Sequence, residues 1–113
     1  MSADFLLDYD NSDPHEDWNG SRGALHWVVD FVADHVRDEE LAASMKDFVK
    51  GGYGYFALSF YTPEQAAEIV RVIREDLKQG VDAAFPSAED RNAVMQAMTA
   101  DLIDKAGRWG KPS

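Results

Sequence analysis

Cysteine is absent from this 113-residue chain, and no long apolar run occurs in it. Without cysteine the chain can form no disulfide framework, thiolate zinc site or cysteine nucleophile, and the absence predicts a cytoplasmic protein. No segment approaches the roughly 20 consecutive apolar residues that a membrane-spanning helix needs. The start of the chain also carries an acid, Asp4, where a signal peptide has bases. We therefore expect no membrane partner.

Basic residues are also scarce. The chain has 11 Lys and Arg against 21 Asp and Glu, a net charge of −10. It shows no basic stripe of the kind that holds a phosphate backbone, so we expect no nucleic-acid partner. The negative charge is concentrated, because residues 1–40 carry eleven acids and only two bases. Such a field favours rapid association with a molecule of opposite charge, and it predicts a basic protein partner.

Length and apolar content predict one domain over residues 1–113. An apolar content of 45% is enough for one hydrophobic core in a chain of this size and leaves no room for a second. Residues 1–20 are interpreted as a short strand followed by an acidic loop, because Asp, Asn, Ser, Pro and Gly follow the apolar start. Residues 110–113 are expected to fray.

Apolar periodicity and end signals predict four helices, at residues 21–37, 39–50, 63–79 and 87–108. The second is expected to end at Gly51-Gly52 and the third at Gly80, because glycine commonly follows the last helical turn. The clearest start signal is Thr62-Pro63-Glu64-Gln65, which has the pattern of a capping box with proline at the first helical position.

One aromatic segment, residues 54–61, alternates like a strand. The alternation predicts that Phe56, Leu58 and Phe60 face inward, and that Tyr55, Ser59 and Tyr61 face outward. A lone strand cannot satisfy its backbone hydrogen bonds, so we expect an antiparallel ribbon with residues 4–9. The predicted fold class is therefore α+β and helix-rich, with four helices around this ribbon.

Short motifs between residues 18 and 73 resemble the YfbM-like family of bacterial proteins. They comprise Trp18, the helix segment Ala24-Leu25-His26-Trp27, the turn Gly52-Tyr53-Gly54-Tyr55, and Tyr61-Thr62-Pro63-Glu64-Gln65 running into Ile69. In that family a tryptophan precedes an Ala-Leu-His-aromatic helix, and a Gly-Tyr-Gly turn leads to a Ser/Thr-Pro-Glu helix start. The resemblance implies an α+β bacterial domain and assigns no catalytic residue.

The first helix carries a candidate metal-binding face. His26, Asp30 and Asp34 follow each other at intervals of four residues, which places an imidazole and two carboxylates in one row. Such a row suits a divalent metal if His15 or Glu16 completes the ligand set. The same spacing also fits a solvated polar face opposite the valine stripe. We favour this second interpretation and expect no cofactor.

The predicted partner-binding surface combines acids from the start of the chain with aromatic residues. Tyrosine and tryptophan dominate protein interfaces because each buries a large rigid ring and still offers one polar atom. The candidates are Asp8, Asp10, Asp13, Glu16, Asp17, Trp18, Tyr53, Tyr55 and Tyr61.

These features favour a non-enzymatic bacterial protein that neutralises a basic partner, of the immunity-protein or antitoxin kind. A nuclease toxin must be cationic to hold a phosphate backbone, and a small acidic inhibitor can occupy the same groove. Two alternatives stay open. One is a small metal-dependent or hydrolytic enzyme that uses His26, Asp30 and Asp34. The other is a structural subunit of a larger assembly.

Overall fold

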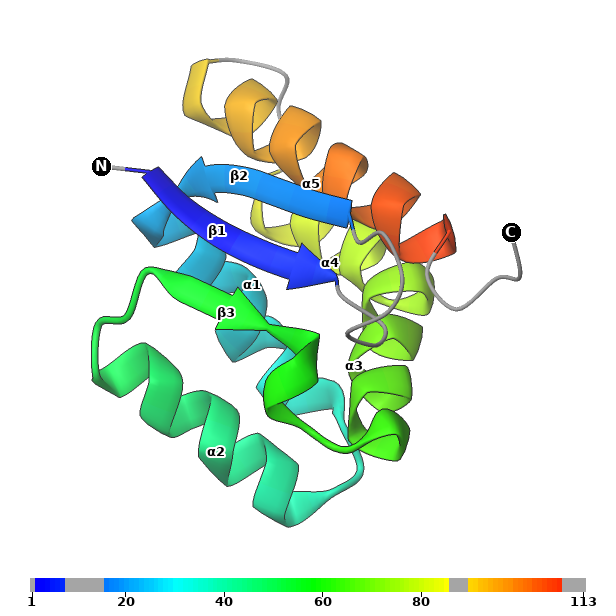
Figure 1. Ribbon diagram of the computed structural model, residues 1–113. Helices are drawn as coiled ribbons and strands as arrows, with labels where there is room; N and C mark the ends of the chain where they lie inside the picture. Colours follow the sequence, from blue (N-terminus) through cyan, green and yellow to red (C-terminus); the bar gives the residue numbers. More distant parts are fainter. Residues whose placement is uncertain (1, 8–15, 86–89, 109–113) are drawn as a thin grey trace.

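The computed structural model describes residues 2–7, 16–85 and 90–108. The acidic residues 8, 10 and 13 and the tail 110–113, for which the sequence made predictions, lie outside the described residues. In chain order the elements are β1 (Ser2–Leu7), β2 (Glu16–Ser21), α1 (Arg22–His35), α2 (Glu39–Lys50), β3 (Tyr55–Ala57), the short 3₁₀ helix η1 (Leu58–Phe60), α3 (Pro63–Glu75), α4 (Leu77–Ala84) and α5 (Asp90–Arg108) (Figure 1). The helix-rich α+β fold class is confirmed.

The small sheet differs from the predicted ribbon. Its strand order is β2-β1-β3, and β1 pairs antiparallel with β2 and parallel with β3. The antiparallel pairing predicted for residues 4–9 and 54–61 is therefore wrong, because the antiparallel partner is β2, within a segment expected to be a loop. Two helices, α1 and α2, lie between β2 and β3 in the chain and allow the parallel pairing of β1 with β3.

A second correction concerns residues 54–61. Only Tyr55–Ala57 forms a strand, and the chain then turns into η1. The turn breaks the two-residue alternation on which the inward and outward assignment depended. Phe56 and Leu58 are buried as predicted, but Phe60 is 58% exposed and Tyr61 is half-buried against the core. The prediction that Phe60 faces inward is wrong.

The helix boundaries agree with the prediction where capping residues or glycines mark them in the sequence. The capping box at Thr62 and Gln65 is present, with hydrogen bonds of 3.1 and 3.2 Å, and α3 begins at Pro63 as predicted. Helix α2 spans Glu39–Lys50, as predicted. The predicted helices 21–37 and 87–108 correspond to α1 and α5, with α1 ending two residues earlier than expected and residues 86–89 outside the described part.

The predicted helix 63–79 is in fact two helices. The chain bends at Asp76, so that α4 begins at Leu77 and continues through Gly80, which was expected to end the helix. Gly80 lies where the Phe31 ring of α1 packs, and a Cβ there would come within 2.6 Å of Phe31 Cζ. A close approach between α1 and α4 therefore explains this glycine better than a helix end does.

The core lies between the inner face of the sheet and the helices; α1 and α4 pass behind the strands in Figure 1, while α2 lies below β3. Phe5 on β1 is opposite Trp18 on β2 and Phe56 on β3, and all three side chains are fully buried. Trp18 Nε1 also donates a 2.8 Å hydrogen bond to the Met98 carbonyl, which joins β2 to α5. The opposite face of the sheet carries Tyr55 and exposed polar residues of β2.

Candidate functional site

An open groove of about 630 Å³ runs between α2 and the segment from β3 to η1. We call it the aromatic groove, and its lining residues are Ser44, Asp47, Phe48, Tyr53, Gly54, Tyr55, Phe60 and Tyr61. The three tyrosines that the sequence assigned to partner binding therefore line one groove. The structure adds Phe48, Phe60 and the Asp47 carboxylate, which the sequence did not assign to partner binding.

The side chains from α2 reach the groove because of helical spacing. Ser44, Asp47 and Phe48 are three and four residues apart, so they share one side of the helix. The hydroxyls of Ser44 and Tyr61 lie 3.2 Å apart and form a hydrogen bond across the groove. This bond connects α2 to the chain that leaves η1.

A glycine turn after α2 places Tyr53 in the groove. Gly51 follows the last turn of α2, and Gly52 adopts a φ of 72°, a left-handed conformation that glycine tolerates well. The chain then turns back so that the Tyr53 ring lies over Gly51, where a Cβ would come within 2.9 Å of Tyr53 Cδ2. His26 on α1 holds this turn, because its Nε2 donates a 2.7 Å hydrogen bond to the Tyr53 carbonyl.

The rings of the groove are unusually exposed for their size. Tyr53 is 60% exposed, Phe60 58% and Tyr55 49%, and these are three of the four large exposed hydrophobic side chains in the described part of the chain. Large apolar side chains gathered on a surface commonly mark an interaction site. The arrangement can therefore bury substantial aromatic area against a ligand or partner.

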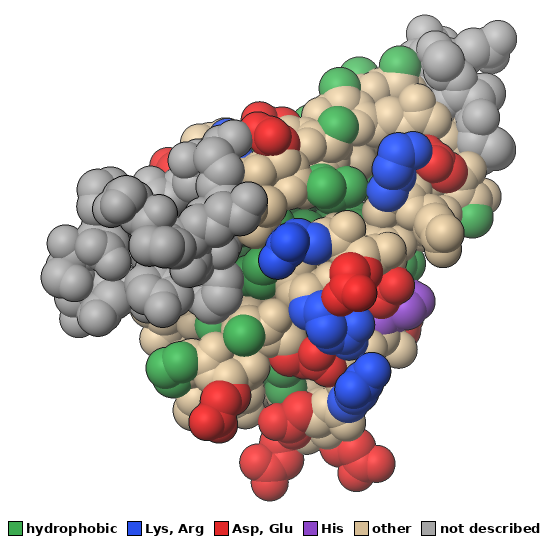
Figure 2. All heavy atoms as spheres, turned by 90° about the vertical axis from the view of Figure 1, so that its right-hand side faces the viewer, with side chains coloured by type: hydrophobic (Ala, Val, Ile, Leu, Met, Phe, Trp, Pro, Cys, Tyr) green, Lys and Arg blue, Asp and Glu red, His purple; other side chains and the backbone are tan. Residues whose placement is uncertain are grey.

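One acidic residue lines the groove, and others lie elsewhere on β2 and at the start of α2. Asp47 lies in it, and Asp17 is exposed on the outer face of the sheet, on the strand neighbouring β1. At the start of α2, Asp38 caps the helix through hydrogen bonds to the amides of Glu40 and Leu41. Figure 2 shows acidic side chains gathered at the lower end of the molecule, where α2 begins in Figure 1.

The other predicted partner-binding residues are placed differently. Trp18 is fully buried, so its assignment to an exposed surface is wrong. Its ring packs in the core on the strand position opposite Phe5. The polar residues around Trp18 gave no sign that this segment is a strand with one buried side chain. Glu16 belongs to β2 by its backbone, while its side chain, like Asp8, Asp10 and Asp13, lies outside the described part.

The candidate metal-binding face holds a lysine. Lys46 on α2 contacts Asp30 at 2.6 Å and Asp34 at 2.8 Å, while His26 is directed to the Tyr53 turn. The hydrogen bond that Lys46 donates to Asp30, followed by the one that it donates to Asp34, raises the pKa of Lys46. Among the described residues, no group of three or more His, Asp or Glu could hold a metal ion, and His15 lies outside them. Within the described residues, the predicted row is therefore divided between the ion pairs of Lys46 and the Tyr53 turn.

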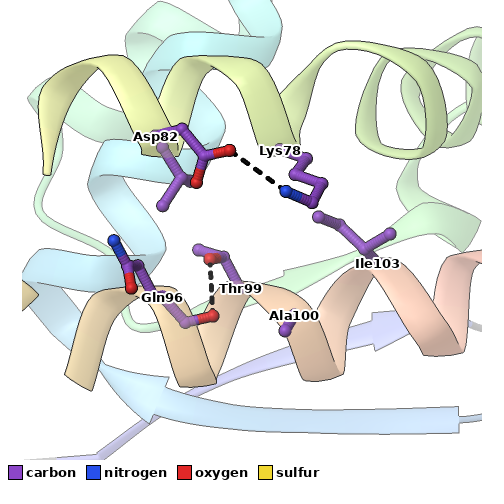
Figure 3. A pocket seen from close by; sticks show the side chains of 7 residues that line it. Lys78, Asp82, Gln96, Thr99, Ala100 and Ile103 are labelled. Atoms are coloured by element: carbon purple, nitrogen blue, oxygen red, sulfur yellow. Dashed lines mark hydrogen bonds and ion pairs between the residues drawn. The ribbon is translucent and has the colours of Figure 1, made fainter. Parts of the chain in front are cut away.

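A second cavity of about 360 Å³ lies between α4 and α5 (Figure 3). Its polar side chains bond within the protein: Lys78 contacts Asp82 at 3.1 Å, and Thr99 donates to the Met95 carbonyl at 2.7 Å. Gln96 Nε2 likewise donates to the Phe85 carbonyl. The cavity therefore offers a ligand little besides aliphatic contact, and the aromatic groove is the better candidate site.

Comparison of the chain with models of protein families, with curated proteins and with solved structures found no match. The resemblance to the YfbM-like family stays a prediction, and the site has to be interpreted from its own geometry. Within the described ranges, no helix is both long and apolar enough to cross a bilayer.

Proposed function

We propose that this chain is a non-enzymatic cytoplasmic protein that binds and neutralises a basic protein partner. The observation that carries the proposal is the aromatic groove, where Tyr53, Tyr55 and Phe60 are each about half exposed or more beside the Asp47 carboxylate. Aromatic rings of this kind supply most of the binding energy at protein interfaces. The cytoplasmic location is part of the proposal and rests on the absence of cysteine.

The net charge of −10 supports a basic partner. Opposite charges steer two proteins together and raise the association rate, whereas well-packed aromatic contacts chiefly slow dissociation. A cationic nuclease toxin is the class of partner that such a surface would suit, because its phosphate-binding groove is a concentration of positive charge. The proposed role is therefore that of an immunity protein or antitoxin.

The experiment begins with affinity capture from a lysate of the source organism, followed by purification of the captured protein. We expect a basic protein whose association rate falls several-fold between low and high salt, while the dissociation rate changes little. Replacing Tyr55 by Ala should instead accelerate dissociation, and Tyr55→Phe should restore most of the lost affinity. A neutral or acidic partner whose binding does not respond to salt would refute the proposal.

A further inference from the structure

The rings of the aromatic groove are arranged around one buried residue. Phe56 lies at the base, with its ring centroid 5.0 Å from Phe48, 5.7 Å from Tyr61 and 6.4 Å from Phe60. Two tyrosines extend this arrangement outward, because Tyr53 lies 5.8 Å from Phe48 and Tyr55 lies 5.9 Å from Phe60. Aromatic rings therefore line both sides of the groove, and the buried Phe56 ring packs beneath them.

Aromatic faces attract cations. The face of each ring carries partial negative charge, so an ammonium or guanidinium group within about 6 Å of a ring centroid is stabilised. Asp47 adds a full negative charge from α2 to the same groove. Rings and a carboxylate together are suited to a positively charged group with a flat apolar surface.

We propose that the aromatic groove binds an arginine side chain of the basic partner, with the guanidinium stacked on the groove rings and paired with Asp47. This inference rests on the proposed function and specifies which part of the partner enters the site. Guanidinium is favoured over ammonium because it is planar, is less strongly hydrated, and can stack on a ring while it donates to a carboxylate.

A second copy of the chain is the competing occupant of an exposed aromatic surface. Each copy carries a net charge of −10, so two copies repel each other where their acidic surfaces approach. The same charge attracts a basic segment. The protein's own Lys46 does not fill this role, because Asp30 and Asp34 hold it on the side of α2 that faces α1.

The experiment titrates the full chain with three small probes, and NMR of the backbone amides measures binding. N-acetyl-argininamide is the cationic probe, N-acetyl-citrullinamide is its neutral analogue of the same shape, and N-acetyl-lysinamide tests the ammonium group. We expect saturable shifts at the Gly54 and Tyr55 amides with the arginine probe. Binding should be about threefold to tenfold weaker for the lysine probe and weaker still for the neutral one.

Two variants test the geometry, and each has a matched control. Asp47→Asn should weaken arginine binding several-fold, whereas Asp82→Asn, which removes the same charge from α4, should leave it unchanged. Gly51→Ala should displace the Tyr53 ring and weaken binding without altering any charge. Its control is Gly23→Ala, because nothing lies within 4 Å of a Cβ at that position. Thermal unfolding shows whether each variant is folded.

Equal binding of the arginine probe and its neutral analogue would overturn this inference, as would shifts that Asp47→Asn leaves unchanged. Self-association of the chain that Tyr55→Ala abolishes would also overturn it in favour of a second copy. Other results distinguish a failure of this inference from a failure of the proposed function. If a basic partner binds with strong salt dependence but tolerates Asp47→Asn and Gly51→Ala, the groove inference is wrong and the proposed function stands. If no basic partner binds, the proposed function is wrong, and the probe titration still decides the groove.

Discussion

Gly80→Ala is expected to destabilise the protein, although the same change stabilises most helices. Gly80 lies in the interior of α4, where alanine would ordinarily gain about 0.5–1 kcal/mol. Here the added Cβ would lie 2.6 Å from Cζ and 2.9 Å from Cδ2 of Phe31, whereas carbon atoms in contact normally lie about 3.5–4.0 Å apart. One of the two groups must therefore move.

The Phe31 ring has little freedom to move. It stacks on Trp27, with centroids 5.5 Å apart, and on His35, with centroids 4.1 Å apart. Overpacking of this kind typically costs about 1–3 kcal/mol, which exceeds the gain in helix propensity. We expect a net loss of about 0.5–2 kcal/mol in the free energy of unfolding, which corresponds to a fall of roughly 2 °C or more in Tm.

Urea denaturation of the wild type, Gly80→Ala and Gly23→Ala measures this difference. Gly23→Ala is the matched control and should be neutral or stabilising, because its Cβ meets nothing within 4 Å. Adding Phe31→Leu to Gly80→Ala should recover part of the loss, which a double-mutant cycle reports as a coupling energy. If Gly80→Ala proves as stable as Gly23→Ala, Phe31 does not pack on α4 as described, and the explanation of this glycine is wrong.

Two further predictions concern the core and the response to acid. Phe56→Ala should lower the free energy of unfolding by about 3–5 kcal/mol, because it truncates a core side chain. Phe60→Ala removes a mostly exposed ring and should cost much less. Equal losses in urea denaturation would contradict the burial of these two residues. Glu68 accepts a 2.6 Å hydrogen bond from Arg71 and a 3.0 Å hydrogen bond from the Arg37 amide. Both bonds favour the charged carboxylate, the Arg71 bond more strongly, and they lower the pKa of Glu68 from its ordinary 4.5. Because the folded pKa lies below the unfolded pKa, this stabilisation is complete above the ordinary pKa and is lost as pH falls through the lowered value. Tm measured over this acid range should therefore fall further for the wild type than for Glu68→Gln, and parallel profiles would show that Glu68 does not contribute.

Local sequence signals determined two helix ends, the start of α3 and the end of α2. The start of α3 at Pro63 follows from Thr62 and Gln65, which satisfy the first amides within four residues of chain. The end of α2 follows from Gly51 and Gly52, because Gly52 adopts a left-handed φ of 72° and the amides of both glycines donate to carbonyls of the last turn. The valine stripe of the first helix is buried in the fold, since Val28, Val29 and Val32 are all fully buried.

The aromatic groove was only partly predictable. Tyr53, Tyr55 and Tyr61 could be proposed from residue type alone, because exposed tyrosines are common at interfaces. Phe60 could not, since its direction depends on where β3 gives way to η1. Asp47 could not be assigned either, because the sequence does not show which side of α2 meets β3.

Tertiary contacts decided what local sequence left open. The β2 segment Glu-Asp-Trp-Asn-Gly-Ser has one large apolar residue and little strand propensity, yet it is a strand because Trp18 completes the core opposite Phe5 and bonds to Met98. The parallel pairing of β1 with β3 and the place of Gly80 inside α4 likewise depend on partners far away in the chain. Local sequence therefore determined where α2 ends and α3 begins, because the necessary hydrogen bonds form within a few residues. Strand pairing and the buried partner of each ring were decided only by the folded structure, because those contacts join distant segments.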